Sequence, residues 1–493
     1  MKKIAEISIL GIIWAIAFFM YLLPVSELPF GDVDASTHFA LADTMGSTDK
    51  SLYWLPYQIN QTYGFASNGK IWYPPQWHLG AASIQLFSGE RIVGFFFFAA
   101  FSSSLIVFGI YLLVKELYGS YQAIIASLLA AFSYRDASVY LFSQWPQAIS
   151  FYYVPLFLYF GYKAILDLEN RKRYSVVGTL ILASQFYFHP QGFIASLLML
   201  VVFVLFISIK EKKLPFKFNE LILPAVILIP LVLLFIAFPL GLTEELESAE
   251  KAPLSRLFSW YPDAENYKDT YPSDYFSYSS SHGLWTLPLL LLGIFYVLYR
   301  RRNQDMLILS MLVSYYLLLH LDVFGYSSRV PRLMQLESLI FYPLIAIGAI
   351  SIASFFKQNK TEIKNIVFGV IIILILIFNA SNSYQKLNSA FKDTERITKE
   401  QLEMTDWLRN NLPRDATISD FGTITLAKIK WLRQLSQRFV IQNPENPNYL
   451  LIDLSDLYSI NAVQQIQSLE SQEKSLNLTP IYDKNNIRVY QIG

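Results

Sequence analysis

Apolar residues are grouped along this chain in long blocks, separated by shorter polar stretches. Window hydropathy picks out eleven apolar segments of the kind that cross a hydrocarbon core of about 30 Å. They lie at about 4–23, 92–114, 119–134, 147–166, 175–188, 192–209, 219–240, 284–299, 305–321, 334–356 and 363–379, the third and fifth being short. The pattern predicts an α-helical polytopic membrane protein with about 11 transmembrane helices.

The first apolar segment follows Met1-Lys2-Lys3, a start that is also typical of a signal peptide. A signal peptide ends at a small-residue cleavage site, and Leu23-Pro24-Val25 is a poor candidate for one. We therefore expect the segment to be retained as the first helix.

Lysine and arginine residues gather in alternate loops between the apolar segments. With Lys2 and Lys3 on one side, the loops of that side contain Lys115, Lys163, Arg171, Lys172, Arg173, Lys210, Lys212, Lys213, Lys217, Arg300, Arg301, Arg302, Lys357, Lys360 and Lys364. Cytoplasmic loops carry an excess of basic residues, so this side is predicted to be cytoplasmic. Eleven spans then place the C-terminal part on the extracytoplasmic side.

The chain changes character from about Tyr384, where long apolar segments end. Thr398–Asn411 has apolar residues at helical spacing, and Pro413 ends this helix. Strand-like runs follow at Ala416–Ile418, Phe439–Ile441 and Tyr449–Asp453. Residues 384–493 are therefore predicted to form a small α/β extracytoplasmic domain. Residues 1–383 would form the transmembrane domain, with large outer loops at 24–91 and 241–283.

Composition agrees with a membrane location and narrows the chemistry. Hydrophobic residues make up 54% of the chain and charged residues only 16%, against about a quarter charged in soluble domains. A net charge of +1 gives no reason to expect nucleic acid as a partner. The chain has no cysteine, which excludes disulfides and thiolate chemistry.

The first outer loop opens with Phe30-Gly31-Asp32-Val33-Asp34. Asp32 and Asp34 together can hold a divalent cation such as Mg²⁺ or Mn²⁺ through carboxylate oxygens. Either carboxylate alone can act as general base for an incoming hydroxyl. The structural alternative is that the two aspartates cap the helix that follows them.

The same loop carries His38 and, further on, Trp72-Tyr73-Pro74-Pro75-Gln76-Trp77-His78. Tyrosine and tryptophan suit a membrane interface, so part of this cluster can be an aromatic belt. All five histidines (His38, His78, His189, His282 and His320) fall in outer loops or at outer helix ends of the predicted topology. Histidine can ligate metal, shuttle a proton or bind phosphate, although a single buried histidine is more often structural. We assign His38, Tyr73 and His78 to a candidate substrate pocket.

Further outer-side residues extend this candidate pocket. Arg135-Asp136 and Gln144-Trp145-Pro146-Gln147 flank the short break between the third and fourth segments. His189 joins the fifth and sixth segments with almost no loop, and Glu244 lies in the long loop 241–283. Long outer loops are often functional. Gln147, His189 and Glu244 are therefore added to the substrate-pocket candidates.

Arg329 and Arg332 stand at the outer end of a late apolar segment, with Glu337 a turn further on. Charge is costly at membrane depth and usually has a partner there. An arginine fork is suited to gripping a phosphate. The alternative is an Arg332–Glu337 ion pair, or side chains that reach the outer headgroups.

The arrangement resembles the GT-C superfamily of membrane glycosyltransferases. The resemblance rests on Asp32-Val33-Asp34 after the first span, Tyr73-Pro74-Pro75 with His78 before the second, Arg329 and Arg332 at a late helix end, and a C-terminal outer domain beginning at Trp407–Pro413. It spans nearly the whole chain, although each motif is short.

The resemblance implies transfer of a sugar from a polyprenyl-(di)phosphate carrier to a lipid, glycan or protein acceptor on the extracytoplasmic face. Asp32 or Asp34 would be the catalytic base or metal ligand, and Arg329 and Arg332 would hold the donor phosphate. The Trp-Trp-Asp motif of oligosaccharyltransferases is missing, since Trp260-Tyr261-Pro262-Asp263 is only a superficial echo. Protein N-glycosylation is therefore disfavoured. The alternatives are a transporter or flippase of a lipid-linked glycan, and a non-catalytic membrane subunit of a glycan-assembly complex.

Overall fold

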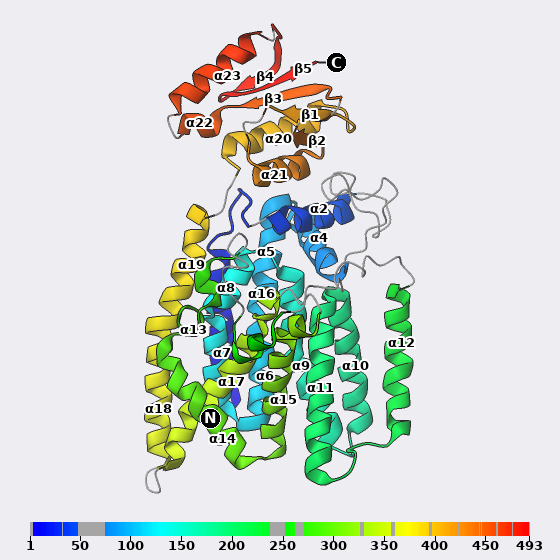
Figure 1. Cartoon of the computed structure of the whole chain (residues 1–493), viewed down its shortest axis with the longest axis vertical. Coiled ribbons are helices and arrows are strands. Elements are labelled where there is room, and N and C mark those ends of the chain that lie inside the picture. Colours follow the sequence, from blue (N-terminus) through cyan, green and yellow to red (C-terminus); the bar gives the residue numbers. More distant parts are fainter. Residues whose placement is uncertain are drawn as a thin grey trace. The chain divides into compact units, whose positions relative to one another are not determined.

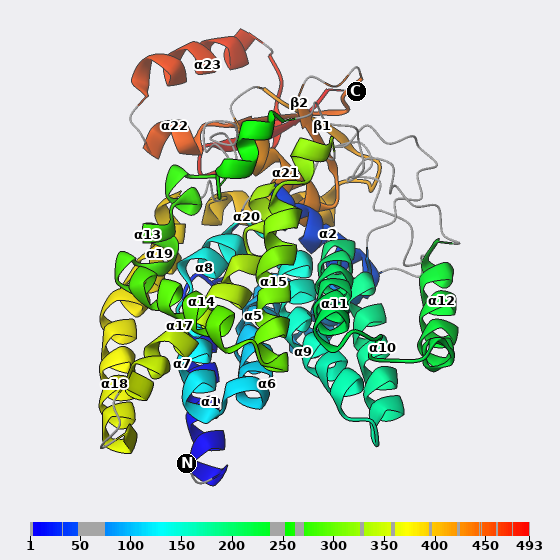
Figure 2. The ribbon, with the colours of Figure 1, turned by 60° about the horizontal axis from the view of Figure 1, so that its bottom comes forward.

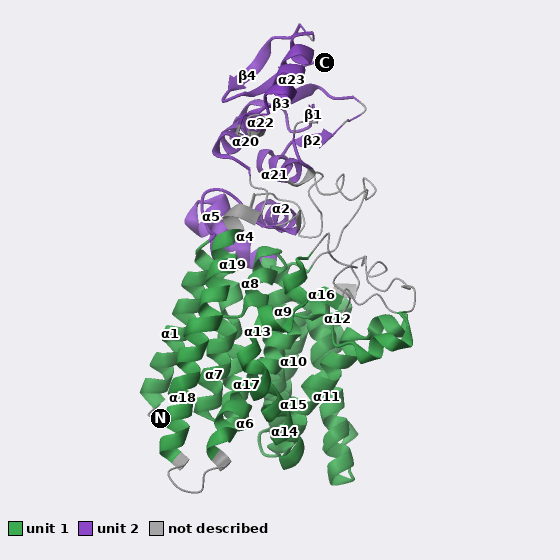
Figure 3. Cartoon of the chain, turned by 60° about the vertical axis from the view of Figure 1, so that its left-hand side comes forward, with its two compact units in different colours: residues 1–23, 71–77, 98–389 green, residues 24–70, 78–97, 390–493 purple. Residues whose placement is uncertain are grey.

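The computed structural model describes residues 3–31, 33–47, 74–236, 252–261, 271–325, 330–355, 360–393, 397–421, 424–442, 444, 446–459, 462–475 and 477–492. The chain divides into two compact units (Figure 3). Unit 1 comprises Met1–Leu23, Ile71–Trp77 and Phe98–Ser389, and unit 2 comprises Pro24–Lys70, His78–Phe97 and Ala390–Gly493.

Unit 1 is a bundle of long helices that run side by side (Figure 1). Its helices are α1 (Lys3–Leu22), the C-terminal part of α5 (Arg91–Ser104), α6 (Ile106–Tyr118), α7 (Ser120–Ala131), α8 (Tyr134–Leu141), α9 (Trp145–Leu166), α10 (Arg171–Phe188), α11 (Pro190–Glu211), α12 (Ile222–Ile236), α13 (Tyr278–His282), α14 (Leu287–Arg300), α15 (Asn303–Leu319), α16 (Val330–Leu333), α17 (Leu336–Ser351), α18 (Lys360–Leu374) and most of α19 (Ala380–Asp393).

The described residues contain seven helices long and apolar enough to cross a membrane, and three shorter apolar helices at Phe218–Leu233, Leu284–Arg300 and Asn303–Leu319. The prediction of a polytopic helical membrane protein is confirmed. The count of eleven spans stays a prediction, since the segment expected at 175–188 lies in α10, which is in neither group.

Two helices form the centre of unit 1, namely α7 and α17. The most apolar stretch of 18 residues is completely buried in the spans Ser120–Leu141 and Val330–Ser351, whereas only 22% of that stretch is buried in Lys3–Leu22 and 17% in Thr361–Ser389. Figures 1 and 2 show α12 and α18 at the margins of the bundle. A helix that is apolar on all sides belongs inside a bundle, and α17 is such a helix: all sixteen of its residues are buried.

Helices α14 and α17 cross at two glycines. A Cβ at Gly293 would lie 2.0 Å from the carbonyl oxygen of Leu344, and a Cβ at Gly348 would lie 1.9 Å from that of Leu289. Only glycine permits this approach of two backbones, which is how small residues bring membrane helices together.

The α6–α7, α9–α10 and α14–α15 turns and the end of α11 lie at one end of unit 1 (Figure 1), which we call the basic end because these parts of the alternate loops carry basic residues. There Lys115 pairs with Glu6 at 2.9 Å, Lys163 with Glu116 at 2.5 Å, Arg171 with Glu220 at 2.6 Å and Arg300 with Asp305 at 2.6 Å. The other end of the same helices, formed by residues 132–147, 188–190, 278–287, 319–325 and 330–337, is called the far end. That the basic end is cytoplasmic stays a prediction.

The C-terminal part of unit 2 is an α/β domain. Its sheet has the order β2-β1-β3-β5-β4, with β1 (Thr417–Asp420), β2 (Phe439–Gln442), β3 (Tyr449–Asp453), β4 (Pro480–Lys484) and β5 (Ile487–Gln491). β1 is parallel to β2 and β3, whereas β5 is antiparallel to β3 and β4. Helices α20 (Lys399–Asn411), α21 (Leu426–Ser436), α22 (Ser455–Ser459) and α23 (Val463–Ser475) accompany it. The small C-terminal sheet expected from the sequence is confirmed.

Helix α20 begins where the sequence predicted. The Thr398 hydroxyl accepts from the Gln401 N–H at 3.2 Å, and the Gln401 side chain accepts from the Thr398 N–H at 2.9 Å, which is a capping box. Gln401 also donates to Asp453 of β3 at 2.6 Å. The cap therefore joins α20 to the sheet.

The N-terminal part of unit 2 holds α2 (Val33–Ser47), the greater part of α4 (Gln76–Ser88) and the start of α5. Phe39 of α2 packs against Trp431 of α21, with ring centroids 5.8 Å apart. Gln437, just after α21, donates to Asp43 at 2.8 Å. The segment after the first helix is thus part of the same compact unit as the C-terminal domain.

Candidate functional site

The far end of unit 1 contains a buried ion pair between α8 and α17. Arg135 Nη1 lies 2.9 Å from Glu337 Oε2, and both side chains are fully buried. The sequence folds this way because α7 stops at Ala131 and a new helix begins after Ser133, whose hydroxyl accepts from the Asp136 N–H at 3.1 Å. This serine cap directs Arg135 and Asp136 into the unit. We call Arg135, Glu337, Tyr261 and His282 the Arg135 cluster.

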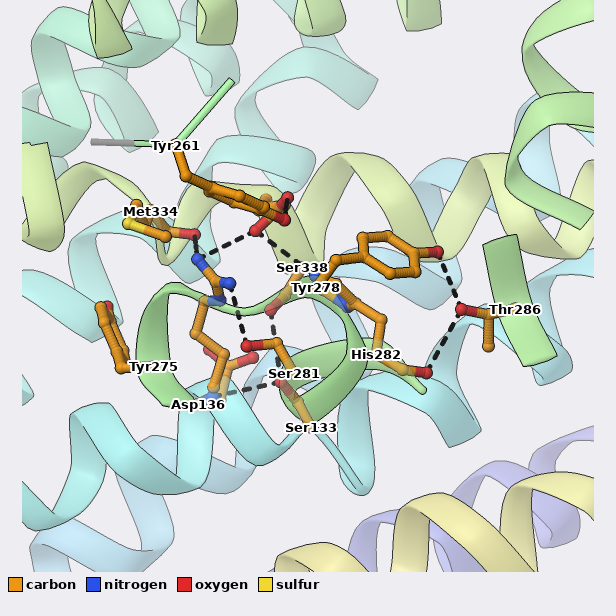
Figure 4. Close-up of polar contacts among 12 residues, drawn as sticks. Ser133, Asp136, Tyr261, Tyr275, Tyr278, Ser281, His282, Thr286, Met334 and Ser338 are labelled. Carbon is orange, nitrogen blue, oxygen red and sulfur yellow. Dashed lines mark hydrogen bonds and ion pairs between the residues drawn. The ribbon is translucent and has the colours of Figure 1, made fainter. Parts of the chain in front are cut away.

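The guanidinium of Arg135 is enclosed by two rings and three acceptors. Its Cζ lies 5.6 Å from the ring centroid of Tyr261 and 5.2 Å from that of Tyr275. Besides Glu337, it donates to the Ser281 hydroxyl at 2.9 Å and to the Met334 carbonyl at 3.5 Å. Figure 4 shows Tyr261, Tyr275, Ser281 and Met334 arranged around this group. Buried guanidinium groups require such neighbours, because desolvation of an unpaired charge is very costly.

Glu337 receives two further contacts from the segment before α14. The Tyr261 hydroxyl donates to its Oε1 at 2.6 Å, and His282 Nε2 lies 3.3 Å from its Oε2. Burial lowers the pKa of His282, despite the opposing attraction of the Glu337 carboxylate. Burial and the charge of Glu337 raise the pKa of Tyr261. Near neutral pH, the cluster therefore combines one cation and one anion with a neutral imidazole and a neutral phenol.

A second polar group lies beside the Arg135 cluster and is centred on Asp136. Its Oδ1 accepts from Gln335 Nε2 at 3.2 Å and from the Tyr152 hydroxyl at 3.3 Å. The hydroxyls of Ser133 and Ser338 lie 3.2 Å apart. Ser133 and Asp136 at the start of α8 therefore contact Ser338 and Gln335 at the start of α17.

Of the predicted site residues that the structure describes, three lie in unit 1, namely Gln147, His189 and Arg332. Gln147 Nε2 donates to the backbone carbonyl of Arg332 at 3.0 Å. The carbonyl of His189 accepts from the hydroxyl of Ser150, one turn of α9 after Gln147, at 2.8 Å. The structure thus places Gln147 against Arg332, and joins the turn at His189 to the same first turns of α9.

The sequence offered an Arg332–Glu337 ion pair as one explanation of the charges near the late helix end. The ion pair in which Glu337 takes part is with Arg135. The expectation that charge at this depth has a partner is thus fulfilled for Glu337, through a residue on another helix. Arg332 itself is partly exposed.

Unit 2 holds three further predicted residues, Asp34, His38 and His78. Nδ1 of His38 lies 2.9 Å from Nε2 of His78, and both imidazoles are buried. Asp34 precedes His38 by one helical turn on α2, so the two positions share a face of that helix. The structure therefore brings together His38 of α2 and His78 of α4, and their place in a substrate pocket stays a prediction.

Asp34 also supports the structural explanation of the aspartate pair. It lies in the first turn of α2, where a negative charge interacts favourably with the helix dipole. This role does not conflict with a catalytic one. Asp43, further along α2, is engaged by both nitrogens of the Arg91 fork at 2.8 Å, and so ties α2 to α5.

Four predicted site residues, Asp32, Tyr73, Glu244 and Arg329, lie outside the described residues. Within the described part of the chain, no three His, Asp or Glu side chains are grouped so that they could hold a metal ion. A divalent cation at Asp32 and Asp34 stays a prediction.

Only weak signals for the Arg135 cluster are present in the sequence. Arg135-Asp136 stood out as a charged dipeptide between apolar segments, His282 belonged to the set of outer histidines, and Glu337 was expected to be paired. None of these was assigned to the site, because the signal that unites them is spatial. Tyr261 had been noted only as part of the Trp260–Asp263 stretch.

A family model described as "Family of unknown function (DUF6541)" matches residues 4–468 of the chain. The protein belongs to this family. No curated protein matches its sequence.

Several solved structures have folds similar to that of this DUF6541 protein. ArnT from Cupriavidus metallidurans in the apo state has a TM-score of 0.60 at 8% identity, covering 99% of this chain and 98% of ArnT. ArnT bound to undecaprenyl phosphate has a TM-score of 0.59 at 9% identity, covering 97% of each chain. Archaeal oligosaccharyltransferase AglB from Archaeoglobus fulgidus, in complex with an inhibitory peptide and a dolichol-phosphate, has a TM-score of 0.58 at 12% identity, covering 92% of this chain and 70% of AglB. The GT-C-like architecture is confirmed at the level of the fold.

Proposed function

We propose that this protein is a membrane glycosyltransferase that moves a sugar from a polyprenyl-(di)phosphate carrier to an acceptor on the extracytoplasmic face. The observation that carries the proposal is the shared fold over nearly the full length of both chains with ArnT, which has been solved with undecaprenyl phosphate bound. The fold alone does not define a reaction. The residues at the far end and in unit 2 supply the chemistry.

The donor phosphate is assigned to Arg332, together with Arg329. Arg332 belongs to α16, immediately before the fully buried α17, at the end of the bundle opposite to the basic end. A prenyl-linked donor keeps its chain in lipid and presents its phosphate at the headgroup level. Guanidinium groups at that level bind the phosphate and stabilise the charge that develops on it as the sugar leaves.

The acceptor is activated by an aspartate of the first loop, Asp32 or Asp34. In this step the carboxylate takes the proton from the acceptor hydroxyl, and the hydroxyl oxygen bonds to the anomeric carbon. The bond from that carbon to the phosphate oxygen breaks, and the polyprenyl phosphate leaves with the electron pair. Atoms and charge balance without a further reactant.

His38 and His78 are assigned to the lining of the acceptor pocket. At 2.9 Å, one ring nitrogen carries a hydrogen and the other accepts it. Such a pair couples the tautomers of the two rings, since one nitrogen must donate and the other accept. Tyr73, Gln147, His189 and Glu244 complete the pocket assignment, and the acceptor remains a lipid, a glycan or a protein.

The direct test is transfer by the purified protein in lipid nanodiscs, supplied with polyprenyl-phosphate sugars labelled in the sugar and with mixed membrane lipids as acceptors. Asp32→Ala or Asp34→Ala should reduce transfer by about 10²–10⁴-fold, the contribution of a general base. Arg332→Ala should reduce it by about 10²–10³-fold, as expected for loss of a group that stabilises developing charge.

Matched controls use exposed charges of the same kind. Glu90→Ala in unit 2 and Arg173→Ala at the basic end remove a carboxylate and a guanidinium that are exposed, and both should leave transfer unchanged. Full activity of both aspartate variants would remove these residues from the mechanism. Movement of an intact lipid-linked sugar across a vesicle membrane, without transfer, would identify a flippase instead.

A further inference from the structure

We propose that Arg135 and Glu337 are positioning residues for the donor site: their ion pair holds the segment Val330–Ser338 in place and so fixes Arg332. The proposal rests on the proposed function for the role of Arg332. The locking of the segment itself rests only on contacts within unit 1.

The segment cannot hold its own shape. α16 has four residues, Val330–Leu333, and a turn at Met334–Gln335 separates it from α17. Short isolated helices are unstable, and one of a single turn depends on tertiary contacts for its geometry. Arg332 is therefore placed by whatever holds this turn.

The backbone of the segment is held by side chains from three other elements. Tyr275, in the 3₁₀ turn η4 (Ser273–Phe276), donates to the Pro331 carbonyl at 2.8 Å. Gln147 of α9 donates to the Arg332 carbonyl at 3.0 Å, and Arg135 of α8 donates to the Met334 carbonyl at 3.5 Å. The side chains of Tyr275, Gln147 and Arg135 are all buried. Three carbonyls within four residues are thus fixed from outside.

The side chains of the segment are held from α8 and α9 as well. Gln335 donates to Asp136 and to Tyr152, each at 3.2 Å, and Glu337 pairs with Arg135 at 2.9 Å. Arg135 and Asp136 are consecutive residues of α8. They contact Glu337 at the start of α17 and Gln335 in the turn before it.

Arg135 is the centre of this arrangement because its fork reaches three partners at once. It connects Glu337, the Met334 carbonyl and the Ser281 hydroxyl, and it is stacked between Tyr261 and Tyr275. A lysine keeps the charge but has no planar fork for these acceptors. Replacement of a buried pair by apolar side chains is often tolerated thermodynamically. The contribution of a buried ion pair to stability does not by itself explain why Arg135 and Glu337 are present. A role in fixing Arg332 does explain it.

The test uses the absence of cysteine from the chain. A nitroxide label is attached to the single cysteine of Arg332→Cys in nanodiscs, and its mobility is measured by electron paramagnetic resonance. In the double variant Arg135→Met with Glu337→Met, which leaves no lone buried charge, the label should become several-fold more mobile. The matched control is Arg300→Met with Asp305→Met, which removes a pair at the basic end whose carboxylate is buried, and it should leave the label unchanged. Equal mobility in wild-type and Arg135→Met/Glu337→Met backgrounds would overturn the proposal, as would an equal increase in the control.

A second measurement uses the unlabelled protein and separates this proposal from the proposed function. Arg135→Lys should lower the rate of sugar transfer by about 100-fold, the scale of a misplacement of about 1 Å, with the unfolding temperature still above that of the assay. Arg300→Lys should transfer at the wild-type rate. Transfer by Arg135→Lys at the wild-type rate would also overturn the positioning role. If the wild-type protein transfers no sugar, the proposed function is wrong. The label experiment then still decides whether the Arg135–Glu337 pair holds the segment Val330–Ser338 in place.

Discussion

The two ends of the helical unit use charge in different ways. At the basic end, Lys163–Glu116 has exposed fractions of 24% and 30%, and even Arg300, whose partner Asp305 is buried, remains 16% exposed. At the far end, Arg135 and Glu337 are both at 0%. Exposed pairs contribute little to stability, whereas a fully buried pair is costly to form and more costly to break. The ion pairs at the basic end lie at the surface of the bundle, whereas the pair at the far end lies inside it and contacts several of its elements.

The Arg300–Asp305 pair and the Arg135 cluster also differ in which parts of the chain they join. Arg300 and Asp305 are 5 residues apart on neighbouring helix ends, while Arg135 and Met334 are 199 residues apart. The Arg135 cluster further includes Tyr261 and His282, and the Asn379 side chain donates to the His282 carbonyl at 3.4 Å. One buried group thus collects four distant segments, as sites built for function commonly do.

The largest expected effect is on stability at the far end. Arg135→Met alone leaves the Glu337 carboxylate buried without its cation and should lower the free energy of unfolding by about 3–5 kcal/mol. Thermal unfolding in detergent, followed by tryptophan fluorescence, measures it. Arg135→Met with Glu337→Met should recover most of the loss. A double variant as unstable as the single one would show that the loss comes from packing and not from charge.

Between the two ends, packing replaces charge as the main constraint. Gly348→Ala puts a methyl group 1.9 Å from the Leu289 carbonyl oxygen and should cost about 1–3 kcal/mol, as overpacking does. Gly369→Ala is the control, because a Cβ there meets nothing within 4 Å. The same unfolding assay compares them, and equal stability of the two variants would contradict the close crossing of α14 and α17.

A smaller effect is expected on how the stability of the far end depends on pH. Burial lowers the pKa of His282, so the folded protein favours the neutral imidazole. The associated stability is complete above the unfolded-state pKa of about 6.5 and is lost as the pH falls from there toward the lowered folded-state value. The unfolding temperature should therefore decrease more steeply between pH 7 and pH 5 in the wild-type protein than in His282→Gln. Parallel curves for the two proteins would refute the assignment.

The smallest effect is expected at the basic end. Lys163→Met removes a half-exposed partner of Glu116 and should change the free energy of unfolding by about 0.2–1 kcal/mol. Because salt screens exposed pairs, the difference should shrink further in 1 M NaCl. A loss as large as that of Arg135→Met would remove the distinction between the two ends.

The sequence predicted the elements that depend on local pattern. The apolar blocks became helices, and the helix that follows Thr398 and the strands at Phe439 and Tyr449 formed where expected. Each of these follows from the period of apolar residues or from neighbours in the chain. The β4–β5 hairpin was missed, since its turn at Asn485 and Asn486, both with positive φ, was not recognised as a hairpin signal.

The candidate site was less predictable, because its contacts are not local. Glu337 could be expected to have a partner, but nothing in the sequence distinguished Arg135 from Arg332 as that partner. His38 and His78 meet, and the prediction that they line one pocket stays a prediction. The assignment of Asp32, Tyr73, Glu244 and Arg329 stays a prediction.

The separation of Arg135 from its partner has a consequence for how the protein is made. At a synthesis rate of about 5–20 residues per second, the ribosome needs about 10–40 s to add the 199 residues between Arg135 and Met334. During that time α7 and α8 have entered the membrane with an arginine whose carboxylate does not yet exist. Until α17 is inserted, the guanidinium must reach water or headgroups at the nearer surface. Insertion of α17 then completes both the charge balance of α8 and the geometry of the far end in a single late step of biogenesis.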